Sequence, residues 1–315
     1  MTILTVTLNP AVDVTYRIPA LDAGTTISVT EVRTRAGGKG VNVASVVRAL
    51  GGDSLVLAFT GVGPPDEFRA GLDELGLDHR LVPALSSVRR TVAVVADDGT
   101  TTNLREAGAE VAIGAEAGIT AALRTELDAG AAAVVVSGSV PPGLAAEVPA
   151  RLVAVCAEYG VPVIADVSGA ALRAVATAAA VLMPNRDELA QLLGTLPRSA
   201  EEVVAAGRRL VRDGAAAIVA TAGEDGAIAV TPAGAWSARP VEAVTGNPTG
   251  AGDAGAAALA RHLAAAGSVS EVDWPGALAD VVATSSAGVR APVAGEIDAE
   301  ARSGWLGAVT VREAG

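Results

Sequence analysis

Short apolar runs alternate with segments of helical pattern along most of the chain. The apolar runs occupy residues 3–8, 54–59, 132–138, 161–167, 180–185 and 216–223. They are continuous rather than alternating, which predicts strands buried on both faces. Helical patterns lie between them at Val41–Leu50, Pro65–Leu75, Leu144–Tyr159, Arg186–Leu193 and Ala200–Asp213. This order predicts an α/β fold with a mostly parallel sheet covered by helices on both faces.

Two segments depart from this pattern, residues 12–34 and 88–105, which are rich in Thr and Val and carry little helical periodicity. In the second, the sequence DDGT separates two alternating runs, as in a β-hairpin. We therefore expect antiparallel strands of a small accessory sheet, a lid formed by about 12–34 and 88–107. No repeat, low-complexity tract or Pro-rich linker divides the chain, so residues 1–315 are predicted to form one domain.

Composition excludes several classes of protein. The net charge of −12 argues against a nucleic-acid-binding surface. Cys156 is the only cysteine, so neither an intramolecular disulfide nor a cysteine zinc site can form. The N-terminal residues lack the basic start of a signal peptide, and no apolar run reaches the roughly 20 residues of a membrane span. We expect a soluble, cytoplasmic protein that binds neither membranes nor nucleic acid.

The sequence NPTGAGDAG, residues 247–255, places glycines around a lone acid at the start of an alanine-rich helix. Gly250, Ala251 and Gly252 can direct successive N–H groups at an anion. Asp253 then lies in the first helical turn, where an acid can simply cap the helix. A cap does not require glycine on both sides of Ala251. An anion hole beside a carboxylate is what phosphoryl transfer to an alcohol needs.

A second glycine-rich turn, AGGKGVNVA at residues 36–44, precedes another predicted helix. Gly37, Gly38 and Gly40 surround Lys39, and such a turn exposes N–H groups to an anion. It is not a P-loop, because no Gly-x-x-x-x-Gly-Lys-Ser/Thr occurs. The alternative is a tight turn with a solvated lysine.

Two weaker patterns each allow a structural and a functional interpretation. Asn185 and Glu188 in MPNRDEL are one helical turn apart and could face a hydrated Mg²⁺, or Asn185 could cap a helix with an acidic first turn. In TLNPAVD, Asp13 follows the first strand, either as a turn acid or as an acceptor for sugar hydroxyls.

Together with SGSVPPG, DVSG and TAGEDG, these motifs resemble the PfkB carbohydrate kinase family in order and spacing, from residue 7 to about 255. Within that family they resemble the 1-phosphofructokinase and tagatose-6-phosphate kinase branch. The resemblance implies a ribokinase-like three-layer α/β/α domain with a mostly parallel central sheet and a small β-sheet lid. It also implies a homodimer formed through the lid.

The resemblance also implies a role for each matching position. Asp253 is the expected catalytic base, and the expected anion hole is Gly250, Ala251 and Gly252. The expected sugar-binding residues are Asp13, Gly38, Asn42 and Ser137. Lys39 and Arg89 are expected to bind a phosphate on the acceptor. Residues expected near the nucleotide are Asn185, Glu188, Thr221, Gly223 and Gly226, with Glu188 also holding Mg²⁺ through water.

The activity implied is ATP- and Mg²⁺-dependent phosphorylation of a ketohexose phosphate, with fructose 1-phosphate as the leading acceptor. Tagatose 6-phosphate and fructose 6-phosphate are alternatives. More distant ones are a kinase of an unphosphorylated sugar or nucleoside and a catalytically silent sugar-binding homologue. A Rossmann dehydrogenase is disfavoured, because no Gly-x-Gly-x-x-Gly follows the first strand.

The chain differs from this branch at several positions. Met183 stands where Lys commonly precedes Pro-Asn, and the sequence NLREAG stands where Asn-Glu-Pro-Gly is usual. Arg105 in the latter could supply a further cation to the site or be a solvated lid residue.

Overall fold

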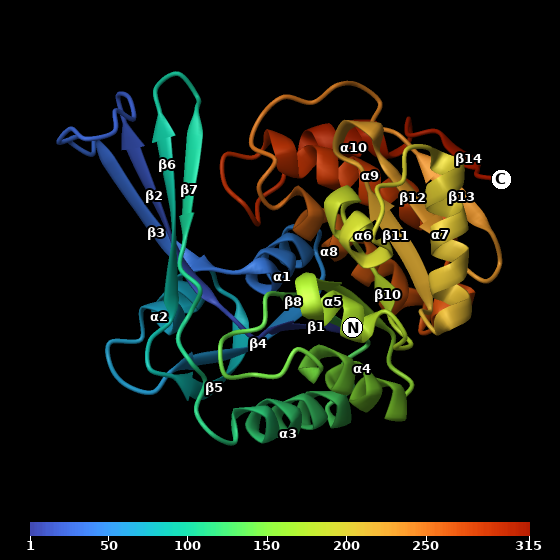
Figure 1. Ribbon diagram of the computed structural model, residues 1–315, viewed down its shortest axis with the longest axis horizontal. Coiled ribbons are helices and arrows are strands. Elements are labelled where there is room, and N and C mark those ends of the chain that lie inside the picture. The colour runs from blue at the N-terminus through green and yellow to red at the C-terminus, as the bar shows by residue number, and fades with distance from the viewer.

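Two β-sheets organise the computed structural model, which describes residues 1–315 (Figure 1). The large sheet has the order β14-β13-β12-β11-β10-β9-β8-β1-β4-β5. Its strands are β1 (Thr2–Thr7), β4 (Asp53–Gly61), β5 (Asp78–Leu85), β8 (Ala133–Gly138), β9 (Val163–Val167), β10 (Val181–Leu182), β11 (Ala217–Thr221), β12 (Ala227–Val230), β13 (Ala235–Ala238) and β14 (Val311–Glu313). The neighbouring strands β5, β4, β1, β8, β9, β10 and β11 are paired in parallel, and β12, β13 and β14 continue the sheet antiparallel.

Helices cover both faces of this sheet. One layer holds α1 (Lys39–Ala49), α8 (Ala251–Ala266) and α9 (Trp274–Arg290), with α10 (Ala299–Leu306) packed on α9. The other layer holds α3 (Ala115–Asp128), α4 (Val148–Glu158), α5 (Gly169–Val175), α6 (Arg186–Leu193) and α7 (Ala200–Asp213). The predicted three-layer, ribokinase-like arrangement is confirmed. None of the helices combines the length and apolarity that crossing a bilayer requires.

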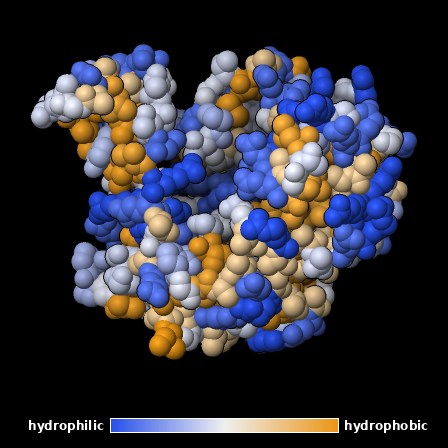
Figure 2. Space-filling model, viewed as in Figure 1, coloured by the Kyte–Doolittle hydropathy of each residue, from blue (hydrophilic) through white to orange (hydrophobic).

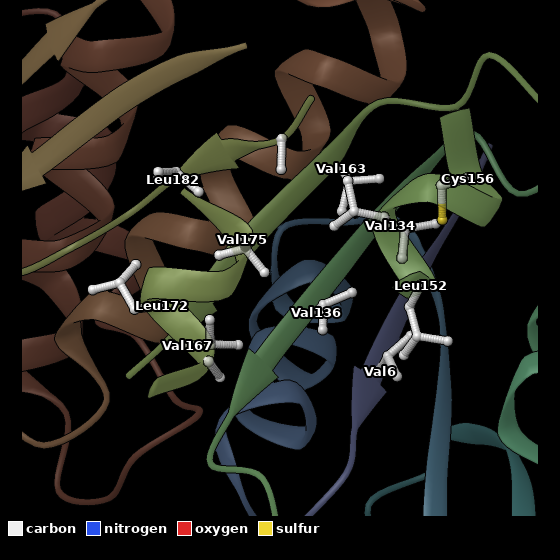
Figure 3. Packing of buried hydrophobic residues seen from close by; sticks show 14 of the residues in the cluster. Val6, Val134, Val136, Leu152, Cys156, Val163, Val167, Leu172, Val175 and Leu182 are labelled. Atoms are coloured by element: carbon white, nitrogen blue, oxygen red, sulfur yellow. The ribbon is translucent and has the colours of Figure 1, made fainter. Parts of the chain in front are cut away.

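The side chains of the continuous apolar strands fill the core between the sheet and its helices, as the sequence pattern predicts. Val6, Val134 and Val136 from neighbouring strands pack against Leu152 and Cys156 of α4 (Figure 3). Burial raises the pKa of the Cys156 thiol to about 12, so it stays protonated and unreactive at neutral pH.

The lid is the separate four-stranded sheet that stands apart from the large sheet in Figure 1. Its order is β3-β2-β6-β7, with β2 at Ala11–Ile18, β3 at Glu31–Gly37, β6 at Arg89–Ala96 and β7 at Thr101–Arg105. The hairpin at DDGT is confirmed, since β6 and β7 are antiparallel neighbours. The expectation of a wholly antiparallel sheet is wrong, because β2 and β6 pair in parallel. These strands are far apart in sequence and meet as non-consecutive neighbours, so no hairpin constrains their direction.

The two faces of the lid have opposite character. Val12 and Val14 are buried against Phe68 and Leu72, both of which belong to α2 (Glu67–Glu74). Helix α2 thus covers the base of the apolar face. Asp13 and its neighbours in register occupy the other face.

A buried carboxylate joins the helices α8, α9 and α10. Asp280 of α9 accepts hydrogen bonds from Arg302 of α10 at 2.6 Å and from Thr284 at 2.8 Å, and lies 3.1 Å from His262 Nε2 of α8. Burial alone would raise the pKa of Asp280, but these partners lower it to about 2. The carboxylate therefore stays ionised throughout the physiological range.

We expect Arg302→Met to lower the free energy of unfolding at pH 7 by about 3 kcal/mol, because it leaves a buried charge without its cation. In the unchanged protein the contribution of Asp280 is fully present above its unfolded pKa near 3.8 and is lost as pH falls towards about 2. Urea unfolding at several pH values would measure both effects. Equal stability of the variant and the parent at pH 7 would contradict this account.

Candidate active site

Three polar side chains stand in one row where parallel strands of the large sheet end. Thr7 of β1 is in register with Ser137 of β8, and Ser137 is in register with Asp166 of β9. All three are buried. Helix α1 begins directly against this row, since a Cβ at Gly40 would lie 2.1 Å from Thr7 Oγ1. The carboxyl ends of parallel strands are where ligands bind in open α/β sheets.

Helix α8 begins at the same edge with the sequence predicted to form an anion hole. Gly250 is its N-cap with φ of 85°, and a Cβ there would lie 2.7 Å from Ala294 Cβ. The Ala251 N–H donates to the Pro248 carbonyl at 3.2 Å. The next N–H groups, of Gly252 and Asp253, lie in the first helical turn, where helices leave such groups free. These N–H groups form the positive end of the helix dipole, which is a suitable place for an anion.

Asp253 is buried, with 6% of its surface exposed. Asn42 of α1 donates from Nδ2 to Asp253 Oδ2 at 2.8 Å. Burial raises the pKa of Asp253 to about 6; the charge of Lys39 and the Asn42 hydrogen bond oppose that rise, and Asp166 and Asp13 add to it. A carboxylate with this pKa is ionised at pH 7 and basic enough to accept a proton from a bound alcohol.

Lys39 lies among carboxylates at the Asp253 end of the site. Its Nζ donates to Asp166 Oδ1 at 2.9 Å, and 38% of the lysine side chain remains exposed. Burial alone would lower the pKa of Lys39, but Asp166, Asp253 and Glu188 outweigh it and raise the pKa above its usual range. The ammonium group is therefore permanently charged beside the candidate base.

Asp13 and Arg89 mark the lid end of the site. Burial raises the pKa of Asp13, which Arg35, Arg89 and Arg105 lower in part. Arg89 donates to the carbonyls of Asn9 at 3.3 Å and Glu106 at 3.0 Å. Figure 2 shows the hollow between lid and large domain, with hydrophilic residues along its floor.

On the expected nucleotide side, the structure shows Asn185 as a helix cap. Asn185 and Glu188 form a reciprocal capping box at the start of α6, with bonds of 2.9 and 3.0 Å. Asn185 also bridges to Thr221, and Gly223 and Gly226 lie in the turn that follows. Gly226 is required sterically, because a Cβ there would lie 2.0 Å from the Ala238 carbonyl oxygen.

The donor set suits a metal held mainly by phosphates. No three His, Cys, Asp or Glu side chains are grouped so that they could hold a metal ion by themselves. Mg²⁺ keeps several waters and commonly uses one or two carboxylates together with substrate phosphates. The capping box uses one oxygen of Glu188, Oε2, and leaves the other available.

Comparison with known proteins agrees with this geometry. Residues 6–296 match the model of the pfkB family carbohydrate kinases. The chain belongs to the PfkB family. Over 266 residues it is 35% identical to a 1-phosphofructokinase of Xanthomonas campestris, covering 82% of this chain and 83% of that protein.

Solved PfkB-type structures share the fold. The phosphofructokinase-2 of Escherichia coli in complex with fructose 6-phosphate matches with a TM-score of 0.86 at 24% identity, over 97% of this chain and 98% of the other. The ribokinase of Arabidopsis thaliana with ribose and ATP matches with a TM-score of 0.73 at 20% identity, over 96% and 98%. The predicted family and ribokinase-like fold are confirmed.

Sequence reasoning missed three parts of this PfkB site. Asp166 lies near the end of the apolar strand β9, a position from which an acid can reach a ligand. No sequence pattern predicted that it would pair with Lys39. Gly37 was expected only as part of a glycine-rich turn, but it also has no room for a side chain, since a Cβ would lie 2.1 Å from Asp13 Oδ2. Segment 291–297 closes the back of the site, where Arg35 donates to the Ala294 carbonyl at 2.6 Å.

The pKa of Asp253 predicts the acid limb of the pH profile. Only the ionised carboxylate can accept a proton, so kcat/KM is expected to fall tenfold per pH unit below about 6. A substrate phosphate also ionises near pH 6. We expect Lys39→Met to move the inflection of Asp253 to higher pH, because the variant lacks the charge that lowers this pKa. An inflection that stays in place would belong to the substrate.

Proposed function

We propose that this PfkB kinase transfers the γ-phosphoryl group of ATP to a ketohexose phosphate, with fructose 1-phosphate as the preferred acceptor. The observation that carries the proposal is the placement of Asp253. It is a buried base at the N-terminus of α8, joined to Asn42 of α1 and next to free helix N–H groups. The similarity to the Xanthomonas 1-phosphofructokinase supports the choice of acceptor.

In the proposed reaction, Asp253 accepts the proton of the acceptor hydroxyl as its oxygen attacks the γ-phosphorus. The bond between that phosphorus and the bridging β–γ oxygen breaks, and ADP leaves with the bond's electrons. The N–H groups of Gly252 and Asp253 stabilise charge on the transferred group, a contribution that commonly amounts to 10²–10³ in rate. Asn42 holds the carboxylate in place.

We assign the remaining roles by position. Asp13, Gly38, Asn42 and Ser137 are proposed to form the sugar site, with the Ser137 hydroxyl still unpaired in the protein. Arg89 is proposed to bind the acceptor phosphate. Lys39 was expected to bind the acceptor phosphate too. Because its carboxylate partners are Asp166, Asp253 and Glu188, we propose that it neutralises the transferred phosphoryl group instead.

ATP is proposed to lie along Asn185, Thr221, Gly223 and Gly226, with Glu188 holding Mg²⁺ through water. When bound, the ion supplies charge neutralisation for the nucleotide phosphates. The cytoplasm, where ATP and sugar phosphates are found, is the proposed place of action.

A panel assay tests the proposal. The protein is incubated with Mg-ATP and each of fructose 1-phosphate, tagatose 6-phosphate, fructose 6-phosphate, fructose and adenosine, and ADP release is measured. The highest kcat/KM is expected for fructose 1-phosphate. A higher value for another ketohexose phosphate would reassign the acceptor, a preference for fructose or adenosine would overturn the sugar-phosphate assignment, and no ADP release would indicate a silent homologue.

We also propose that two chains associate through their lids. Beyond the part covered by α2, the apolar face stays open: Val32 of β3 is 57% exposed and Leu104 of β7 59% exposed. Between them lie Tyr16 and Val94, paired in register. A small sheet with open edges and one uncovered apolar face favours association with a second copy.

Light scattering at micromolar concentration should therefore give twice the 31.0 kDa chain mass. The double variant Val32→Glu with Leu104→Glu should return the mass of a single chain, because it places charges in the proposed interface. As a control, Ile113→Glu, at an exposed apolar position outside the lid, should leave the mass unchanged. A parent protein that is monomeric and fully active would refute the dimer.

A further inference from the structure

Four side chains from the four lid strands form one row on the face towards the hollow. Arg35 of β3 is in register with Asp13 of β2, Asp13 with Thr91 of β6, and Thr91 with Arg105 of β7. Residues directly opposite one another in a sheet project to the same face. Arg89 lies two residues before Thr91 and so projects to this face as well.

The three arginines of this face differ in what they already bind. Arg35 donates to the Ala294 carbonyl and to Ser45 Oγ, which commits it to the back of the site. Arg89 donates to two backbone carbonyls through Nε and one terminal nitrogen, and its other terminal nitrogen is free. Arg105 is exposed at the end of β7, and its side chain makes neither a hydrogen bond nor an ion pair to a protein group.

Charge at this end of the site is arranged for an anion. Arg105 lies near enough to Arg89 to oppose the charge of the Arg89 guanidinium. Asp13, whose pKa both arginines lower, is half-buried and lies in register between β3 and β6. Lys39 does not contribute here, since its partners are Asp166, Asp253 and Glu188. Arg89 and Arg105 both face Asp13, and Arg89 also lies near Glu106. A ligand with two negative charges would stabilise these two adjacent cations.

We propose that Arg105, together with Arg89, binds the phosphate that the acceptor already carries, and that Arg105 is the residue that selects a phosphorylated acceptor over a free sugar. The proposal rests on the proposed function and adds its specificity determinant. A guanidinium suits this role because it can form two parallel bonds to phosphate oxygens. In this proposal Lys39 neutralises the transferred phosphoryl group, and Arg105 binds the phosphate that the acceptor already carries.

The test compares Arg105→Ala, Arg105→Lys and a matched control, Arg33→Ala. Arg33 lies on the same lid face one row farther out, opposite Thr15, and pairs only with Glu31. With fructose 1-phosphate, Arg105→Ala should raise KM about 10- to 100-fold, the usual effect of losing a charged hydrogen bond, and change kcat less than threefold. Arg105→Lys should recover part of the loss, and Arg33→Ala should change KM less than twofold.

Binding without turnover separates this proposal from the proposed function. Calorimetry of fructose 1-phosphate and of fructose, with no nucleotide present, should show affinity for the phosphate form falling in Arg105→Ala while affinity for fructose is unchanged. The inference is overturned if both affinities fall equally, if neither falls, or if Arg33→Ala loses as much as Arg105→Ala. If the parent protein binds fructose 1-phosphate through Arg105 but releases no ADP, the proposed function fails and this site stands.

Discussion

Asp253→Asn is expected to lower kcat by about 10²–10⁴-fold, the usual cost of removing a general base. The amide keeps the size of the side chain and can still accept the hydrogen bond from Asn42, but it cannot take a proton from the acceptor. Stability should not decrease, because burial disfavours the ionised carboxylate, as its pKa of about 6 shows. Steady-state kinetics and thermal unfolding of the same preparation measure both.

Asp273→Asn provides the control for the capping interpretation. Asp273 caps α9 through a bond from the Gly276 N–H at 3.3 Å and lies outside the site. Asparagine caps helices about as well as aspartate, so this variant should keep both its stability and its kcat. If Asp253→Asn also kept its kcat, Asp253 would be a helix cap and not a base.

Gly250→Ala is expected to lower kcat by about 10²–10³-fold, as when an anion-hole donor is displaced. The φ of 85° is unfavourable for alanine, and the new methyl group would lie 2.7 Å from Ala294 Cβ. Either α8 or the segment behind it must move, which displaces the N–H groups of Gly252 and Asp253. Displacements of about 1 Å at such a site can cost 10²-fold in rate.

Gly267→Ala separates strain from catalysis on the same helix. Gly267 ends α8 with φ of 75°, and a Cβ there would meet nothing within 4 Å. This variant should lose stability by roughly 1–2 kcal/mol from the left-handed conformation and keep its kcat. Parallel loss of activity in both variants would show that Gly250 acts only through the stability of α8.

The layered fold could be predicted because its strands are buried on both faces and therefore read as continuous apolar runs. The parts that could not be predicted lack such a pattern. Strand β10 is reduced to Val181–Leu182 although its apolar run is longer, and β14 has only three residues. The parallel pairing of β2 and β6 depends on tertiary contacts between distant segments, which local periodicity does not report.

The site was predictable where local chemistry restricts the residue type. Glycine at 250 is required by conformation, and Asp253 stands out beside it. The partners of Lys39 were not predictable, because Asp166 lies 127 residues away and meets it only through the register of β1, β8 and β9. Arg35 and segment 291–297 were missed for the same reason.

The bond between Asn42 and Asp253 joins residues 211 positions apart, and this separation has a consequence for synthesis of the protein on the ribosome. At about 5–20 residues per second, roughly 10–40 s pass between the emergence of the two residues. Strand β1 likewise cannot pair with β8 until β8 is synthesised, and the first residue of β8 comes more than 100 positions later. During that interval the nascent chain exposes an apolar strand edge, the kind of surface that aggregates. Catalytic competence therefore comes late in translation, and a ribosome that stalls before residue 253 would release an inactive, association-prone fragment.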